Sequence, residues 1–392
     1  MTITDRAARA ARALLRRVSS DSPSSDGRQS GSGTSASSSP AAGSTGTTYA
    51  GDRIVAAGRV APVSDLSAAS EHLRSIGRAG KNWTNAVLVA EALRQGVEVT
   101  ADPKRPKRIM LRHGGASFWW GNGVTSLNTL GARRIVSYKE VTSRLLLNRQ
   151  LSAPVNAVFD PADAPRAWAW GEALRPLVIK PHNGNQGTDV FVGITDREEF
   201  VETFTRVGRD HGSVLVEQFH SGVEHRCLVL DHRLIAVTRR RPASVLGDGT
   251  SSITQLVEAK NADRGLMHKQ LPLDEEASAY LARHGHSADS VPATDERVYL
   301  TGASNIHRGG DALDATDELT AAEVDLAQEA SKQIPGLRLA ALDLLLPRRD
   351  GDGAPLVLEI NANPMISMHH LPWEGTPRNA AGAILAAMFP TL

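Results

Sequence analysis

The sequence contains a single cysteine, almost no net charge and no long apolar run, and each shortage excludes a class of protein. With Cys227 alone, neither an intramolecular disulfide framework nor a zinc site of several cysteines can form. No apolar run approaches the ~18 residues of a membrane-spanning helix. Lysine and arginine (44) balance aspartate and glutamate (43), which does not favour nucleic acid as a partner. We therefore expect a cytoplasmic protein that binds neither membrane nor nucleic acid, and the lone cysteine suits a reducing compartment.

The N-terminal end is unlike the rest of the chain. Residues 21–50 include 10 serines, 5 glycines and 4 threonines, too few apolar groups to offset the entropy of ordering, so we expect residues 1–50 to be a disordered tail. Its first 17 residues carry five arginines without the apolar stretch of a secretory signal. They form either a contact for a partner or, as we favour, a solvated helix.

From about residue 51 the composition is that of a globular protein of two or three domains. Apolar periodicity predicts helices and strands in alternation. Helices are expected at 81–95, 136–150, 196–210, from the Thr320–Glu323 capping box to about 333, and at about 377–389. Strands are expected on both sides of Gly114–Gly115, Asp231–His232 and the turn 348–354, and around the loop after Lys180. The order of elements in 255–300 is not predicted.

The last strand pair places two acids and an amide together. The midpoint of Asp343 and Glu359 is Gly351 in the turn, so a symmetric hairpin sets them opposite each other. Asn361, two residues after Glu359, points to the same face. Two carboxylates within apolar strands repel unless a cation lies between them, and Mg²⁺ prefers oxygen ligands. The alternative, two solvated acids at a strand edge, fits the apolar neighbours less well.

Lys180 closes an apolar strand and precedes a loop with Gly184 and Gly187. Such a loop exposes backbone N–H groups that can cover phosphates, and lysine supplies a charge. The pattern is unspecific, because any glycine hairpin near a lysine shares it. A helix-opening P-loop is excluded because a strand follows.

Together these residues resemble the ATP-grasp ligases, and most of all the ATP-grasp domain of cyanophycin synthetases and bifunctional glutathione synthetases. The resemblance covers about residues 84–390. It rests on Lys139, Lys180, VEQF at 216–219, Glu224, Asp343 and EIN at 359–361, and on the stretches EHRCLV, RRRPASVLGDG, NADRG, NIHRGG and EINANPMISMHHLPWEGTPR. NIHRGG also resembles the enzymes that add glutamate to a ribosomal protein C-terminus.

The resemblance implies an α/β (α+β) protein with the ATP-grasp fold. A small N-terminal α/β domain (51–135) would follow the tail and precede two subdomains that clamp ATP. These are a lid subdomain (136–220) and a C-terminal subdomain (221–392) with an insertion at about 255–300.

It also implies roles for individual residues. ATP and Mg²⁺ are the expected cofactors, with two ions bound and Mn²⁺ as an alternative. The phosphates would contact Lys139, Lys180 and a loop that includes Gly184, Asn185, Gln186 and Gly187. Adenine would contact Glu217, Gln218 and Phe219, ribose would contact Glu224, the metal ligands would be Asp343, Glu359 and Asn361, and the acyl phosphate would face Arg226, Arg240 and Arg308.

Several of these residues have a plainer interpretation. Arg239, Arg240 and Arg241 are consecutive in a strand, so some of them are solvated. We expect Cys227 to be a core residue, His369 and His370 to serve a substrate loop or packing, and His182 more often than not to have no contact with ATP.

The expected activity is ATP-dependent ligation of a small-molecule carboxylate to an amine through an acyl phosphate. Two alternatives stay open: a phosphotransferase that stops at the phosphorylated acid, and a silent nucleotide-binding module. The sequence leaves homo-oligomerisation open.

Overall fold

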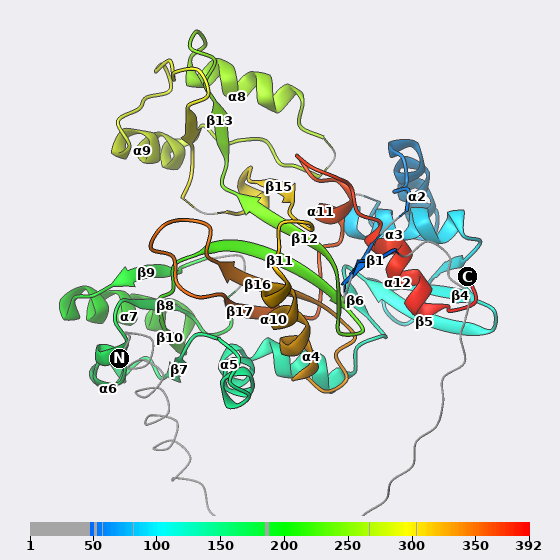
Figure 1. The fold of residues 1–392 in the computed structure, drawn as a ribbon, viewed down its shortest axis with the longest axis horizontal. Coiled ribbons are helices and arrows are strands. Elements are labelled where there is room, and N and C mark those ends of the chain that lie inside the picture. Colours follow the sequence, from blue (N-terminus) through cyan, green and yellow to red (C-terminus); the bar gives the residue numbers. More distant parts are fainter. Residues whose placement is uncertain are drawn as a thin grey trace, which may run out of the picture.

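The computed structural model describes residues 48–50, 53–56, 58–80, 82–184, 188–265, 267–302 and 304–392. At its centre is a five-stranded antiparallel sheet, the central sheet, of order β15-β12-β11-β16-β17 (Figure 1). Its strands are β11 (Val223–Leu230), β12 (Arg233–Arg241), β15 (Asp311–Asp314), β16 (Leu339–Leu346) and β17 (Leu356–Asn361).

Both faces of the central sheet are covered, which explains why its strands read as nearly continuous apolar runs. On β11, Cys227 and Val229 pack into a core beneath helix α10 (Ala321–Lys332), whereas Leu228 and Leu230 pack into the core of the N-terminal domain. The alternation of side chains along one strand therefore joins two hydrophobic cores.

The N-terminal domain contains an antiparallel sheet of order β3-β4-β5-β6 and two helices that precede it in sequence. The elements are α2 (Val63–Ser75), α3 (Trp83–Arg94), β3 (Glu98–Ala101), β4 (Ile109–His113), β5 (Ala116–Gly121) and β6 (Val124–Thr125). The predicted strands around Gly114–Gly115 are confirmed, and positive φ angles of 53° and 80° explain the two glycines in that turn. A short pair, β1 (Thr48–Ala50) and β2 (Arg53–Val55), precedes the domain.

The C-terminal helix α12 (Ala380–Met388) returns to pack with α3 in the core of the N-terminal domain. The predicted start at Pro377 is wrong. The helix begins at Ala380 because the side chain of Asn379 accepts a hydrogen bond from the backbone N–H of Gly382 at 3.0 Å.

A second sheet, the lid sheet, has the order β7-β10-β8-β9. Its strands are β7 (Asn156–Phe159), β8 (Leu177–Pro181), β9 (Phe191–Ile194) and β10 (Val214–Gln218). Helix α6 (Ala164–Gly171), the turn η2 (Glu172–Leu174) and helix α7 (Arg197–His211) accompany it, and Trp168, Phe200 and Phe204 fill a separate core. The predicted strands after Arg175 and the helix at 196–210 are confirmed.

Two helices, α4 (Leu130–Ser137) and α5 (Lys139–Asn148), connect the N-terminal domain with the lid sheet. The helix predicted over 136–150 is confirmed as α5, but its start is wrong, since Tyr138 is extended (φ −105°, ψ 100°) and separates the two helices. Lys139 therefore becomes the first residue of α5.

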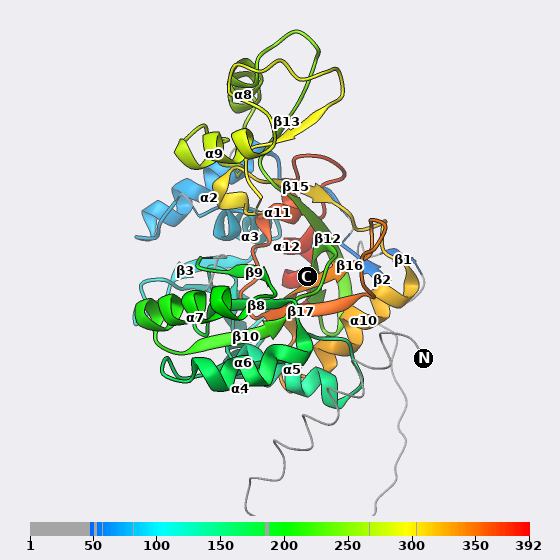
Figure 2. The same cartoon turned by 90° about the vertical axis from the view of Figure 1, so that its left-hand side faces the viewer.

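Residues 242–310, here called the insertion, connect β12 to β15. The part that carries α8, α9 and β13 projects from the rest of the molecule (Figures 1 and 2), whereas Met267 and Ile306 pack against Met368. The insertion holds β13 (Ser244–Leu246), α8 (Ile253–Ala262), α9 (Glu275–Arg283), β14 (Arg297–Tyr299) and the turn η3 (Ile306–Arg308). It has its own small core, which includes Val245, Val257 and Leu281. The sequence-based boundaries of the domains remain a prediction.

Three further expectations concern local structure. The capping box of Thr320 and Glu323 is confirmed at the start of α10, and the turn at Asp231–His232 is confirmed with φ angles of 46° and 63°. The predicted tail lies outside the described residues except for Thr48–Ala50, which form β1. In the described part of the chain, no helix has the length and apolar character needed to cross a bilayer.

Candidate active site

Two acids of the central sheet face each other on neighbouring strands. Asp343 of β16 pairs with Glu359 of β17, so the predicted register is confirmed. The register shifts by one residue directly after Asp343, which places the irregularity of the hairpin beside the two acids. Asp343 is buried and Glu359 is half-buried.

Each of these acids has its own cation. Nε and Nη2 of Arg226 donate to the two carboxylate oxygens of Asp343 at 2.7 and 2.6 Å. Nζ of Lys139 lies 3.1 Å from Oε2 of Glu359, and the side-chain amide of Asn361 donates to Oε1 at 2.8 Å. Burial alone would raise the pKa of Glu359, but Lys139, Asn361 and Arg226 outweigh it and lower that pKa to about 2. Glu359 is therefore held as a carboxylate, and Asp343 is fixed by two hydrogen bonds from one guanidinium.

Arg240 extends this network along β12. Its guanidinium lies 3.5 Å from Oδ2 of Asp343 and forms an ion pair with Glu224. The structure thus brings together, on one face of the central sheet, seven residues that the sequence analysis selected: Lys139, Glu224, Arg226, Arg240, Asp343, Glu359 and Asn361.

The lid sheet carries a second network. Nζ of Lys180 donates to Oε1 of Glu217 at 2.8 Å, and both side chains are buried. The amide of Asn156 donates to Oε2 of Glu217 at 3.2 Å and to Oγ of Ser143 at 3.1 Å. The backbone N–H groups of Gln218 and Phe219 donate to the carbonyls of Val155 and Pro176, which precede strands β7 and β8 of the lid sheet.

Helix α5 connects the two networks. Lys139 reaches Glu359 on the central sheet, and Ser143, one helical turn later on the same side, contacts Asn156 on the lid sheet. Between them in sequence, Glu140 lies 3.0 Å from Nε2 of His182, which follows β8. A single helix therefore holds the central sheet, the lid sheet and the stem of the glycine loop.

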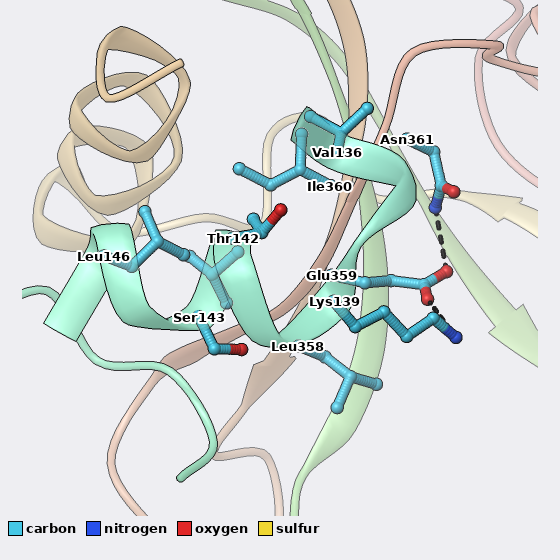
Figure 3. A pocket seen from close by; sticks show the side chains of 10 residues that line it. Val136, Lys139, Thr142, Ser143, Leu146, Leu358, Glu359, Ile360 and Asn361 are labelled. Carbon is cyan, nitrogen blue, oxygen red and sulfur yellow. Dashed lines mark hydrogen bonds and ion pairs between the residues drawn. The ribbon is translucent and has the colours of Figure 1, made fainter. Parts of the chain in front are cut away.

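A pocket lies between α5 and β17, and Figure 3 shows Lys139 and Glu359 side by side at its edge. Ser143, Thr142 and Leu146 line it from the helix, and Leu358 and Ile360 line it from the strand. Its polar edge, where Asn361 and Lys139 both contact Glu359, has the chemistry to bind phosphate and cation. Its remaining wall combines the apolar side chains of Leu146, Leu358 and Ile360 with the hydroxyls of Thr142 and Ser143.

The oxygen donors on β16 and β17 fit a hard divalent cation. Asp343 and Glu359 offer carboxylate oxygens and Asn361 adds an amide oxygen, the ligand types that Mg²⁺ prefers. Among the described residues no group of three or more histidine, cysteine, aspartate or glutamate side chains converges as a ready metal site. In the structure Arg226 and Lys139 balance the negative charge at this place.

Other expected site residues lie elsewhere. The half-exposed guanidinium of Arg308 pairs with Asp274 at 3.3 Å and Glu276 at 2.9 Å on the insertion, so the described contacts do not join it to Asp343. The N–H of Gly184 donates to the carbonyl of Pro181. Asn185, Gln186 and Gly187 lie outside the described residues.

The cysteine and the paired histidines are core residues. Cys227 is fully buried, and burial, helped by nearby acids, raises the pKa of its thiol, as expected for a packing role. Nδ1 of His369 lies 2.9 Å from Oγ1 of Thr238, and His370 accepts the backbone N–H of Ala381 at 2.9 Å. These contacts place packing ahead of a metal-binding role for both histidines.

Sequence reasoning missed Glu140, Ser143 and Asn156. Two of them follow Lys139 on α5 at spacings of one and four residues, a pattern that becomes visible once the helix start is known. Asn156 carries no signal in the sequence, since only the pairing of β7 with β10 brings it to Glu217.

Comparisons with known proteins agree with this geometry. No protein-family model matches the chain. It is 35% identical to cyanophycin synthetase of Trichormus variabilis over 262 residues, 64% of this chain and 29% of that protein. It is 31% identical to the bifunctional glutathione biosynthesis protein of Mannheimia succiniciproducens over 322 residues, 78% of this chain and 42% of that protein. The crystal structure of a bifunctional glutathione synthetase from Pasteurella multocida matches with a TM-score of 0.64 and 29% identity, covering 83% of this chain and 46% of that one. The chain thus spans less than half the length of these relatives.

Proposed function

Since the chain has the ATP-grasp fold and is related to cyanophycin synthetases and bifunctional glutathione synthetases, we propose that it is an ATP-dependent carboxylate–amine ligase. The observation that carries the proposal is the opposed pair Asp343 and Glu359, each with its own cation, beside a pocket between α5 and β17. The proposed ligase activity concerns the part of this chain that aligns with its longer relatives.

ATP would lie between the central sheet and the lid sheet, with its phosphates toward Lys139 and Lys180. These two lysines come from different elements, α5 and β8, and each is now paired with a glutamate, Glu359 or Glu217. Phosphates would compete for both lysines and would draw the lid sheet toward the central sheet. Glu224 would then exchange Arg240 for the ribose hydroxyls.

Asp343, Glu359 and Asn361 would hold Mg²⁺, one or two ions, which supplies charge neutralisation for the phosphates when bound. Arg226 and Arg240 would turn from the acids to the transferred phosphoryl group. A substrate carboxylate attacks the γ-phosphate, ADP leaves, and the resulting acyl phosphate is attacked by the amine, which expels inorganic phosphate. Closing the lid keeps water from the acyl phosphate, which would otherwise hydrolyse.

The test measures ADP release with a panel of amino acids and small peptides, offered singly and in pairs. The proposal predicts that one acid–amine pair stimulates ADP release and gives an amide by mass spectrometry. Hydroxylamine in place of the amine should trap the same acid as its hydroxamate, which reports the acyl phosphate.

Two results would contradict ligation, and a third would contradict the site. A phosphorylated acid as the final product, even with amines present, would indicate a phosphotransferase. Nucleotide binding without turnover for any pair would indicate a silent module. Turnover that is unaffected by Glu359→Gln would place the chemistry elsewhere in the chain.

A further inference from the structure

A second charged cluster, separate from the candidate active site, lies where the insertion joins the central sheet. Asp311, the first residue of β15, is fully buried and contacts three cations, Arg241, Lys260 and Arg264, which with it make up what we call the Asp311 cluster. Lys260 and Arg264 come from α8 and the loop after it, and Arg241 ends β12.

The hydrogen bonds in this cluster are short and saturate the acid. Oδ2 of Asp311 accepts from Arg241 at 3.0 Å and from Lys260 at 2.8 Å, while Oδ1 accepts from Arg264 at 2.8 Å. One carboxylate therefore meets three positive charges. Outside the cluster, the exposed Glu374 contacts Arg241 at 3.2 Å, which leaves an excess of one positive charge.

An excess of buried positive charge is costly unless an anion accompanies it. The side chains of Arg241 and Lys260 are 14% exposed and that of Arg264 is 2% exposed. Burial, opposed by Asp311, lowers the pKa values of Lys260 and Arg264, the direction expected for cations with too little negative charge around them.

Two buried polar atoms of the cluster and its neighbour Ser244 lack partners. Nε of Arg264 and Oγ of Ser244 find no hydrogen-bond partner among the described residues. Ser244 belongs to the cluster's surroundings because its carbonyl accepts a hydrogen bond from Lys260 at 2.8 Å. Buried donors of this kind are normally satisfied, so both atoms retain the capacity to bind an added acceptor.

Trp373 closes the cluster on another side. Its ring lies 5.3 Å from Nζ of Lys260 and 5.0 Å from the guanidinium carbon of Arg264, distances at which a ring stabilises a cation. The guanidinium of Arg264 also donates to the carbonyl of Gly309 at 2.7 Å. The cluster therefore joins the segment 305–310 to the segment around Trp373. Its member Arg241 is the residue after Arg240 on β12.

Resting on the proposed ligase function, we propose that the Asp311 cluster binds a spectator carboxylate of a substrate, that is, a carboxylate other than the one that is phosphorylated. The ligand class is an amino acid or peptide with a free carboxylate, which would form ion pairs with Arg241 and Lys260. In the structure the carboxylate of Glu374 pairs with Arg241, and the substrate carboxylate would displace it on binding.

The binding test uses the full chain with a nonhydrolysable ATP analogue and Mg²⁺. The probes are the standard amino acids, glycyl dipeptides and the matching C-terminal amides, each assayed by thermal shift and then by calorimetry. At least one free acid is expected to raise the melting temperature, and its amide is expected to bind at least tenfold more weakly.

Two variants locate the binding. Glu374→Gln removes the competing anion and is expected to tighten binding of the free acid about two- to fivefold, the factor for one exposed ion pair, with no effect on the amide. Arg241→Gln should abolish the preference for acid over amide. The matched control is Glu318→Gln. Oε1 of Glu318 lies 3.6 Å from Nη2 of Arg239, which is on the same strand as Arg241, so this variant should bind the acid and the amide as the parent does.

The outcomes divide clearly. Three results would overturn the proposal: equal binding of acid and amide, no binding of any acid, or weaker acid binding by Glu374→Gln. Each would indicate that the cluster only stabilises the attachment of the insertion to the central sheet. Because Glu374 is exposed, this variant stays informative if Arg241→Gln fails to fold. Selective acid binding without ADP release in any pair would retain the carboxylate site and refute the ligase instead.

Discussion

Asp343 and Glu359 are register partners, yet neither carboxylate depends on the other for its charge balance. Arg226 holds the first with two hydrogen bonds, and Lys139 contacts the second from another element. Two acids that face each other are thus each held in place by a separate cation. Under the proposed function, the phosphates of ATP and a metal ion would replace these partners together.

Glu359→Gln tests this arrangement. The amide is a poorer ligand for Mg²⁺, so turnover should fall several hundredfold, which corresponds to about 3–4 kcal/mol of transition-state stabilisation. Because the carboxylate is stabilised in the folded state, the variant should also lose about 1–3 kcal/mol of unfolding free energy at pH 7. Steady-state kinetics over a Mg²⁺ series and urea denaturation measure the two effects. The exposed change Glu329→Gln serves as control, and near-parental turnover at unchanged Mg²⁺ demand would refute the assignment.

The buried pair Lys180 and Glu217 predicts a coupling. Lys180→Ala leaves a buried carboxylate without its cation, so we expect a loss of about 3–5 kcal/mol in stability together with weaker ATP binding. The double variant Lys180→Met with Glu217→Gln removes both charges and should recover most of the stability but not the ATP affinity. Denaturation and nucleotide calorimetry on the double cycle measure this. Full recovery of ATP affinity in the double variant would exclude Lys180 as a phosphate contact.

Arg308→Ala separates two roles for that arginine. Its ion pairs with Asp274 and Glu276 are exposed, so their loss should cost less than about 1 kcal/mol in stability. If Arg308 turns toward the acyl phosphate during turnover, the rate should fall at least tenfold while the KM for ATP stays unchanged. Asp274→Asn breaks one of the same ion pairs and should leave the rate nearly intact. A selective loss of ATP affinity would move Arg308 to the nucleotide side.

Four buried histidines predict sensitivity to acid. Burial lowers the pKa of His225, His268 and His370 to about 4 and that of His369 to about 3, against an ordinary value of 6.5. Between pH 6.5 and 4 the unfolded chain therefore binds more protons than the folded chain, so stability must decrease as the pH falls. The slope should approach about 1.4 kcal/mol per pH unit for each histidine.

Urea denaturation between pH 7 and 4.5 measures this slope. His225→Gln should reduce the proton uptake on unfolding by about one, whereas the exposed His284→Gln should not change it. A stability that is flat over this range would show that the buried histidines do not titrate as described.

The elements with a strong local signal could be predicted from the sequence. The capping box of Thr320 and Glu323 correctly predicts a helix start. The symmetric positions of Asp343 and Glu359 about Gly351 correctly predict that the two residues pair. These features depend on residues near in sequence or on one turn. Tyr138 shows the limit, because it is extended between two helices although no glycine or proline marks the break.

The parts that could not be predicted depend on contacts across the fold. Asn156 becomes important only where β7 meets β10, and Asp311 only where α8 returns to the central sheet. Polar side chains like these look the same in sequence as solvated ones. Their role comes from burial and partners, which a single sequence does not contain.

The insertion leaves the central sheet at Arg241 and re-enters it at Asp311, and these two residues are register partners on neighbouring strands. A segment whose ends meet and whose interior has its own core can change in length or content without shifting β11, β16 or β17. If the Asp311 cluster binds substrate as proposed, changes in the insertion would alter substrate choice while the acids on the central sheet stay fixed. In evolutionary terms, the insertion has the form of an exchangeable module, and chimeras cut at this residue pair would test whether it carries specificity.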